Sequence, residues 1–596
     1  MAFGTWQDSA ARLIGVATGR QVADTVILGG TWVNVHSGEL LLGTDVAIAD
    51  GRFAYCGMDA SAMIGPDTQI IDAEGRFMVP GFCDAHMHVE SGMLTISQFV
   101  RAVLPHGTTT MFIDPHEIAN VLGIRGIRLM HDEALVQPIN VMVQMPSCAP
   151  SAPGLETTGF ELGPEDVAEA MRWPNIVGLG EMMNFPGVVN ADPKILGEIA
   201  ATQSAGKTVG GHYASPDLGP AFHGYVAGGP ADDHEGTREI DAIARVRQGM
   251  RAMLRLGSAW YDVAAQITAV TNKGLDSRNF LLCTDDCHSG TLVNEGHMNR
   301  VVRHAIECGV EPVTAIQMAT LNTATHFGME RELGSITPGR RADMILTSDL
   351  EALPIETVIA RGVVAASEGT IRVRGAKFTW PESAYETVRM RRALGARDFD
   401  IAAPLGTGFT TVRVIGVVEN QAPTRALKAE LPVRDGVVQM DPGRDICQIA
   451  LVERHRATGT VTHGFVSGFG YHQPCALAST VAHDSHHMIV VGTDHEDMAR
   501  AANRLADVGG GVTFWSGGVE QALIELPIAG LMSDAPAAQI AARADQLLEA
   551  MGAAGCHLNN AFMQHSLLAL VVIPELRISD LGLVDVRKFE KTGLFV

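Results

Sequence analysis

The stretch that decides how this chain folds is Met78-Val-Pro-Gly-Phe-Cys-Asp-Ala-His86-Met-His88-Val-Glu90. It combines an apolar start, a Pro-Gly turn and a short strand that carries two histidines one residue apart. Alternate residues of a strand point to the same face, so His86 and His88 can present both imidazoles to one cation. Because isolated His-x-His pairs are common, a metal site also requires ligands from elsewhere in the chain.

The region that follows this stretch, residues 80–334, alternates apolar strand patterns with helical patterns, which predicts parallel βα units. Eight units over about 250 residues fit a (β/α)8 TIM-like barrel, so the predicted fold class is α/β. The carboxyl ends of barrel strands meet at one mouth, where their polar residues are expected to lie together. The predicted strands are Phe82–His88, Thr109–Asp114, Asn140–Met145, Ile176–Glu181, Thr208–His212, Asp232–His234, Met250–Leu256 and Phe280–Asp285.

Short alternating strands flank the barrel region on both sides. Asp50-Gly51 between apolar strands is a hairpin signal, and strands of the same character return near Met344 and Val358. Further on, residues 488–515 show a strand, a helix and a second strand. The predicted parts are a helical lead-in at 1–22, a flanking β-sandwich domain from 23–79 plus 335–384, the barrel at 80–334 and a C-terminal α/β domain at 385–596.

The composition restricts the class of partner and the compartment. A net charge of −23 argues against nonspecific binding to nucleic acid or to an anionic membrane. No apolar run reaches the ~18 residues of a membrane helix, and the first residues show no secretory signal. Nine scattered cysteines without a C-x-x-C pair predict a reducing, cytoplasmic location. We also expect a homo-oligomer, a dimer or larger, because most oligomers are of this kind.

Six residues with metal-binding side chains lie at the ends of five predicted strands. Each alone is more often an ordinary hydrogen-bonding residue than a ligand. Together, four histidines and two carboxylates match a two-metal site for borderline divalent ions such as Zn, Mn or Fe. The predicted ligands are His86, His88, Glu181, His212, His234 and Asp285.

This pattern resembles the amidohydrolase superfamily, whose members are metal-dependent hydrolases on a (β/α)8 barrel flanked by a β-sandwich. Many members carry a carbamylated lysine at the end of strand four, where this chain has Glu181 in Gly178-Leu-Gly-Glu-Met-Met-Asn. A glutamate there, with Cys283-Thr-Asp-Asp, is similar to the bacterial adenine deaminase branch. Ala482-His-Asp-Ser-His and Pro574-Glu-Leu-Arg-Ile-Ser resemble the C-terminal domain of that branch, so the resemblance covers nearly the whole chain from about residue 20.

The resemblance implies hydrolytic deamination of adenine, a small-molecule substrate, to hypoxanthine and ammonia in purine salvage. It implies two divalent ions per chain, Mn or Fe first and Zn as an alternative. In this assignment Glu181 bridges the ions. One ion is held by His86, His88 and Asp285, and the other by His212 and His234.

The chemistry also requires groups that move protons. Asp285, beside a metal-activated water, is placed to take its proton and pass it toward the leaving ammonia. Glu235, directly after His234, and Glu117 are candidates for protonating the purine ring, with a salt bridge or a helix N-cap as the alternative role. His116 is a candidate for orienting the attacking hydroxide or for acting as another acid.

Other interpretations stay open on the sequence. A different amidohydrolase would act on a cyclic amide or an N-acetyl group, and a non-catalytic barrel would serve as a scaffold. The cluster His483, Asp484, His486 and His487 could hold another metal, cover the barrel mouth or form a hydrogen-bonded turn. We expect a structural or covering role for it.

Overall fold

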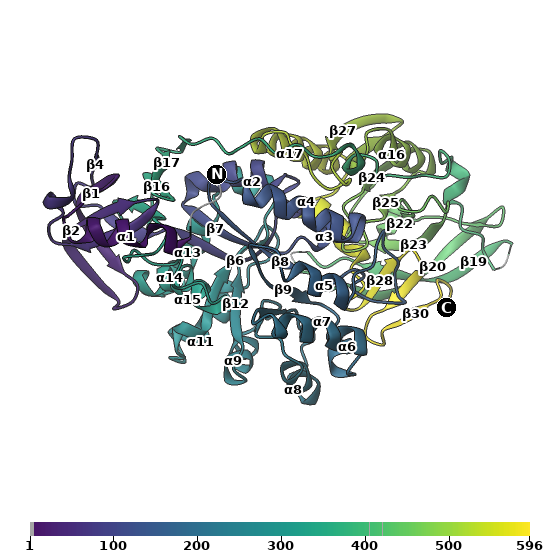
Figure 1. The fold of residues 1–596 in the computed structure, drawn as a ribbon. Helices are drawn as coiled ribbons and strands as arrows, with labels where there is room; N and C mark the ends of the chain where they lie inside the picture. The colour runs from purple at the N-terminus through teal and green to yellow at the C-terminus, as the bar shows by residue number, and fades with distance from the viewer. Residues whose placement is uncertain (1–4, 405, 420) are drawn as a thin grey trace.

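The computed structural model describes residues 5–404, 406–419 and 421–596 and arranges them as three parts in a row (Figure 1). A strand-rich part at one end is followed by a central barrel and by a C-terminal part at the other end. Helix α1, Trp6–Ala17, accounts for most of the predicted lead-in, of which residues 1–4 lie outside the described residues. Within the described ranges, no helix combines the length and the apolar character needed to cross a membrane.

The central part is a ring of parallel strands, which confirms the predicted (β/α)8 fold class. Its strands are β6 Phe82–His88, β7 Thr108–Ile113, β8 Asn140–Met145, β9 Ile176–Met182, β10 Thr208–Gly211, β11 Asp232–Asp233, β12 Arg251–Arg255, β13 Phe280–Cys283 and β14 Asp285–Asp286. One sheet runs β10-β9-β8-β7-β6-β14 and a second runs β11-β12-β13. The gap between β10 and β11 is bridged by the Ala231 N–H, which donates to the Val209 carbonyl at 2.8 Å.

The strand ends agree with the predicted ones to within one residue, except in the last strand. There the predicted strand Phe280–Asp285 is interrupted at Thr284, whose N–H and hydroxyl both donate to the buried Asp84. The interruption lets Asp285 pair with Met87 of β6, which closes the ring. Asp285, predicted at the end of the last strand, therefore lies where the last strand pairs with the first strand of the barrel.

The barrel is a packed core and its strands are covered on both faces. Every residue of β7 and β8 is buried, as expected for parallel strands under a layer of helices. Inside the ring, Phe112 stacks on Phe327 with 4.0 Å between ring centroids. Proline starts four of the surrounding helices, where its missing N–H costs nothing. The helices are α2 Ile96–Val103, α3 His116–Leu122, α4 Ile124–Leu135, α5 Pro164–Ala170, α6 Phe185–Val189, α7 Pro193–Ser204, α8 Pro220–Ala227, α9 Glu239–Arg247, α10 Val263–Gln266, α11 Thr268–Thr271, α12 Ser289–Asn294, α13 Met298–Glu307, α14 Pro312–Met318 and α15 Leu321–His326.

The strand-rich part is one sheet built from segments on both sides of the barrel sequence. Its path is β18-β17-β16-β15-β5-β1-β2-β3, with β4 paired to β1. The two segments join where β5 runs antiparallel to β15. The domain boundaries themselves stay a prediction. The strands are β1 Thr25–Asn34, β2 Glu39–Ala49, β3 Arg52–Gly57, β4 Gln69–Asp72, β5 Phe77–Pro80, β15 Met344–Thr347, β16 Thr357–Ala360, β17 Val363–Ser367 and β18 Thr370–Ile371.

The C-terminal part contains a second large sheet in the order β21-β20-β19-β23-β22-β25-β24-β26-β27, and a small sheet of β28, β29 and β30. The predicted strand, helix and strand over residues 488–515 are present as β25, α16 and β26, with β24 between the two strands. The elements are β19 Gly408–Gly416, β20 Arg425–Arg434, β21 Val437–Val438, β22 Ile446–Val452, β23 Val461–Ser467, β24 Cys475–Ser479, β25 Met488–Gly492, α16 His495–Asp507, β26 Gly511–Ser516, β27 Val519–Glu525, α17 Ala537–Ala553, α18 Ala561–Ser566, β28 Leu576–Ser579, β29 Gly582–Asp585 and β30 Glu590–Thr592.

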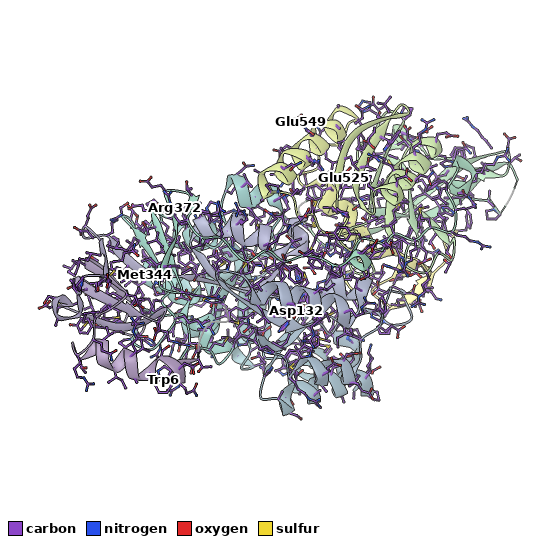
Figure 2. All side chains as sticks on the ribbon, turned by 45° about the horizontal axis from the view of Figure 1, so that its top comes forward. Trp6, Asp132, Met344, Arg372, Glu525 and Glu549 are labelled. Carbon is purple, nitrogen blue, oxygen red and sulfur yellow. The ribbon has the colours of Figure 1, made fainter. Side chains whose placement is uncertain are left out.

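The C-terminal part packs directly against the barrel. The Thr95 N–H donates to the Ser533 carbonyl at 3.1 Å, and the Ser533 N–H donates to the Met93 carbonyl at 3.0 Å. One hydrophobic core continues from Met87 in the barrel to Leu531 in the C-terminal part. Figure 2 shows Glu525 and Glu549 on the upper side of this part, whereas Trp6 lies at the lower left in the strand-rich part. The C-terminal part and the barrel are therefore joined by hydrogen bonds and by a shared hydrophobic core.

Candidate metal centre

The carboxyl ends of the barrel strands bring all six predicted ligands into one buried cluster. Two histidines lie in β6, one residue after β10 and one after β11 supply two more, and β9 and β14 supply the carboxylates. Each of the six residues is at most 4% exposed, so the cluster is closed to bulk water. The residues are His86, His88, Glu181, His212, His234 and Asp285.

Glu181 lies at the centre of the cluster, and its two oxygens face different histidines. Its Oε2 lies 2.9 Å from Nε2 of His234, 3.6 Å from Nε2 of His86 and 4.0 Å from Nε2 of His212. Its Oε1 lies 3.7 Å from Nε2 of His88. Among the described residues, Glu181 is therefore the one carboxylate that lies within 4.0 Å of all four predicted histidine ligands.

Asp285 forms the second acidic element of the cluster. Its Oδ1 lies 3.2 Å from Nε2 of His88, and its Oδ2 accepts a hydrogen bond from Nη1 of Arg255 at 2.9 Å. Burial alone would raise the pKa of Asp285, but His88 and Arg255 outweigh it and hold this pKa well below its ordinary value. Its φ of +60° is uncommon for a residue with a side chain, and such conformations concentrate at functional sites.

The side chains in the cluster fit a divalent metal. Nδ1–H of His88 donates to the Asp114 carbonyl at 2.9 Å, which leaves Nε2 as a lone-pair donor inside the cluster. Nε2 of His86 is buried and has no hydrogen-bond partner among the described residues. A buried imidazole nitrogen without a partner is costly in an empty protein and is explained by a bound cation. Mixed imidazole and carboxylate ligands suit borderline divalent ions.

Arg255, at the end of β12, belongs to the site but was missed in the sequence. It is 3% exposed, and its guanidinium contacts Glu235 and Asp285 through Nη1 and Asp262 through Nε at 3.0 Å. The sequence signal that could have identified it is an arginine near the carboxyl end of the otherwise apolar predicted strand Met250–Leu256. A buried arginine at a strand end of a barrel needs carboxylate partners, and these lie at the same mouth.

The other predicted site residues lie at different distances from the cluster. Glu235 lines the cavity, with Oε1 at 3.5 Å from Nε2 of His212. Burial would raise the pKa of Glu235, but Arg255 and His212 lower it overall, so this residue is a carboxylate. His116 contributes Nδ1 at 3.2 Å from Oε1 of Glu181. These two predicted residues therefore reach the centre.

Glu117 does not line the cavity. Its Oε1 accepts a hydrogen bond from the Ser91 hydroxyl at 3.1 Å and lies 3.8 Å from Nδ1 of His483. Its Oε2 lies 3.9 Å from Nε2 of His486. Glu117 was predicted as a candidate for protonating the purine ring. In the structure it contacts two histidines of the C-terminal part instead of lining the cavity.

The cavity at the cluster is small and is closed by the C-terminal part. Its volume is about 30 Å³, enough for about two water molecules. The apolar side of its wall comes from residues 567–573, and His483 and Asp484 form another side. Oδ1 of Asp484 lies 3.3 Å from Nε2 of His116, so the C-terminal part also contacts a residue beside the metal cluster. The predicted covering role of the His483–His487 segment agrees with this position.

Comparisons with known proteins place the chain in a family. The amidohydrolase family model matches residues 77–219 and 233–365, and the model for the adenine deaminase C-terminal domain matches residues 421–590. The adenine deaminase of Ruegeria pomeroyi is 72% identical over 99% of this chain and 98% of its own length. The adenine deaminase of Mesorhizobium japonicum is 67% identical over 99% of this chain and 98% of its own length.

A more distant relative shows the same match along the whole chain. The adenine deaminase of Moorella thermoacetica is 48% identical over 98% of this chain and 97% of its own length. These likenesses confirm the resemblance that began with the histidine pair and with Glu181. Together with the buried His, Asp and Glu cluster, they indicate a divalent metal centre. The chain is a member of the adenine deaminase family within the amidohydrolase superfamily.

Proposed function

We propose that this chain catalyses the hydrolysis of adenine to hypoxanthine and ammonia. The relatives that carry this activity in their name match both the barrel and the C-terminal part, so no domain of this chain lies outside the comparison. The observation that carries the proposal is Glu181, a buried carboxylate within 4.0 Å of all four histidines at the barrel mouth. This arrangement suits a hydrolase that activates water, and it has no use in a scaffold.

The proposal includes two divalent ions per chain, Mn or Fe, with Zn as the alternative. His86, His88 and Asp285 would hold one ion and His212 and His234 the other, with Glu181 contacting both sets. Ions in such a centre lower the pKa of bound water from 15.7 toward ~7, which supplies a nucleophile at neutral pH.

Two carboxylates are placed to move the protons of the reaction. Attack of water on the carbon that bears the amine breaks one O–H bond and requires a proton at the adjacent ring nitrogen. Glu235 enters as a carboxylate, can take the first proton on Oε1 and can deliver it to that nitrogen. Asp285, equally ionised, can take the second proton on Oδ1 and deliver it to the amine, which leaves as ammonia. His116, at the other side of Glu181, is placed to orient the attacking water.

The route to the centre passes through a larger outer cavity of about 810 Å³. This outer cavity shares four lining residues with the metal cavity, so only side chains separate the two spaces. Because the metal cavity itself has room for about two water molecules, the wall between them must move before the fused rings of adenine can enter. The shared residues are Glu235, Arg255, Trp260 and Ile573.

The proposed reaction is tested directly by turnover. Protein loaded with Mn is expected to release ammonia from adenine with a matching gain of hypoxanthine, measured by ultraviolet absorbance and by a coupled ammonia assay. Hydantoin and dihydroorotate serve as comparison substrates, since a related amidohydrolase would open these cyclic amides. Turnover of a cyclic amide without turnover of adenine would refute the proposal.

Removing the metal should affect stability as well as activity. A ligand that binds only the folded state stabilises it in proportion to its occupancy, so chelation is expected to lower Tm and abolish ammonia release. Restoring Mn, Fe or Zn separately should restore Tm, with two ions per chain by elemental analysis at full activity. Full activity with fewer than two ions would contradict the binuclear assignment, and the relative kcat values would identify the preferred metal.

We propose a reducing cytoplasm as the setting of the reaction. All nine cysteines are free thiols and most are buried, which agrees with a reducing cytoplasm. Since the proposed product is hypoxanthine, the proposal includes a role in purine salvage. The predicted homo-oligomer stays a prediction.

A further inference from the structure

The C-terminal part contributes one histidine to the wall of the metal cavity. His483 lies between β24 and β25, is 4% exposed and lines the cavity beside Asp484. We propose that His483 contacts the purine through Nε2, and that Glu117 and Asp484 hold its ring in the orientation that makes this contact. The inference rests on the proposed adenine deamination and adds a substrate-contacting residue outside the barrel.

The contacts of the His483 ring define which nitrogen is available. Its Nδ1 lies 3.6 Å from Oδ1 of Asp484 and 3.8 Å from Oε1 of Glu117. These distances are those of ion pairs rather than of hydrogen bonds, and both carboxylates lie on the Nδ1 side of the ring, which favours a proton on Nδ1. Nε2, on the opposite side of the ring, is buried and has no hydrogen-bond partner among the described residues. Because His483 lines the metal cavity, a ligand in that cavity would give this buried nitrogen the partner that it lacks.

Glu117 is held in place and so can act as the anchor of this ring. It is fully buried, and the Ser91 hydroxyl lies between its Oε1, at 3.1 Å, and Oδ1 of Asp286 and shares its one proton between them. On its other side, the Ala482 N–H donates to Nδ1 of His486 at 3.2 Å. His486 therefore carries its proton on Nε2, which lies 3.9 Å from Oε2 of Glu117.

The same hydrogen bond argues against a third metal site at this place. Glu117, His483 and His486 lie close enough together to hold an ion. The lone pair of His486 Nδ1 already accepts a hydrogen bond, and its Nε2 bears the proton, so neither nitrogen can coordinate. The cluster is thus better explained as a support for His483.

The ligand expected at Nε2 is a planar nitrogen heterocycle. A purine offers ring nitrogens and N–H groups around its edge and two apolar faces. The cavity wall opposite the polar groups consists of Leu567, Leu570 and Ile573, with the Trp260 ring beside them. Apolar walls with a few directed polar groups are the usual way to bind and orient such a ring. His483 would then contact one edge of the purine through Nε2.

Two substitutions separate substrate contact from a purely structural role. The asparagine amide of His483→Asn reaches roughly the position of Nδ1, and the glutamine amide of His483→Gln reaches roughly that of Nε2. If Nε2 contacts adenine, H483N should lower kcat/KM about 10–100-fold, mostly through KM, whereas H483Q should retain most of it. If the ring only supports Glu117 and Asp484, the order should reverse, and the proposal would be overturned.

A matched control comes from the same segment. His487 is buried and its Nε2 donates to the Thr157 carbonyl at 2.9 Å, away from the cavity. H487Q can keep that hydrogen bond and is expected to match the wild type in KM and kcat. Elemental analysis should find two ions in every variant, because none of these substitutions removes a proposed ligand.

If a variant loses turnover, its equilibrium binding of hypoxanthine can still be measured and still tests the contact. Hypoxanthine, the product, can be titrated against the tryptophan fluorescence of each metal-loaded variant, with Tm as a check of folding. Weaker binding to H483N than to H483Q supports the contact, and equal binding to both and to the wild type refutes it. Failure of the wild type to deaminate adenine would instead refute the proposed function, which separates the two conclusions.

Discussion

Replacing Glu181 by glutamine is expected to remove at least one divalent ion per chain and to lower kcat at least about 10³-fold. The oxygens of Glu181 face His88 on one side and His86, His212 and His234 on the other. An amide offers one oxygen and an NH2 group that cannot coordinate, so one side of the centre loses its ligand. A bound metal supplies several kcal/mol of barrier lowering, and each ~1.4 kcal/mol is tenfold in rate.

The measurement is metal content by elemental analysis together with kcat for adenine. The matched control is Glu198→Gln on α7, another fully buried glutamate. Burial raises the pKa of Glu198 to about 8, so its side chain is largely protonated at neutral pH and glutamine resembles it closely. E198Q should keep both ions and its activity. Wild-type metal content and kcat in E181Q would show that the carboxylate does not bridge.

The second large effect is expected from Asp285→Asn, which should lower kcat about 10³–10⁴-fold while the ions stay bound. The amide keeps an oxygen that can face His88, but it cannot take up a proton. Loss of a positioned proton-transfer group costs about 10²–10⁴-fold. The rate should fall at constant metal content and with unchanged hypoxanthine binding, measured by elemental analysis and fluorescence titration.

Asp285 and Asp262 both contact Arg255, so Asp262→Asn is the control for an indirect effect through this arginine. Asp262 accepts a hydrogen bond from Nε of the same Arg255 at 3.0 Å, on the side away from the ligands. If the effect of D285N came from disturbing Arg255, D262N should show a loss of similar size. A loss of about tenfold or less in D262N, beside the large loss in D285N, would assign the effect to proton transfer. Loss of metal from D285N would instead assign Asp285 a ligand role alone.

Most of the barrel and its ligands were predictable because both depend on local patterns. Apolar strand segments alternate with helices of ordinary length, and the ligand side chains follow directly at strand ends. Any parallel barrel gathers these ends at one mouth, so the ligands could be assigned together without knowing distances. The break at Thr284 was not predictable, because it depends on hydrogen bonds to Asp84, 200 residues earlier in the chain.

Glu117 shows where local reasoning ends. It follows His116 directly, and both residues start α3. Consecutive residues of a helix point about 100° apart, so the turn that directs His116 toward Glu181 directs Glu117 away from it. The sequence shows that both residues follow a strand, but the direction of each depends on how α3 leaves the barrel.

The sequence by itself determined the family, the barrel and which six side chains gather at the barrel mouth, because these follow from residue type and strand spacing. Their role as metal ligands stays a prediction. The tertiary structure alone decided that Arg255 neutralises Glu235 and Asp285, and that His483 and residues 567–573 close the cavity. These contacts join residues that lie up to several hundred positions apart. Their geometry depends on how the C-terminal part packs against the barrel, and no local pattern encodes that packing.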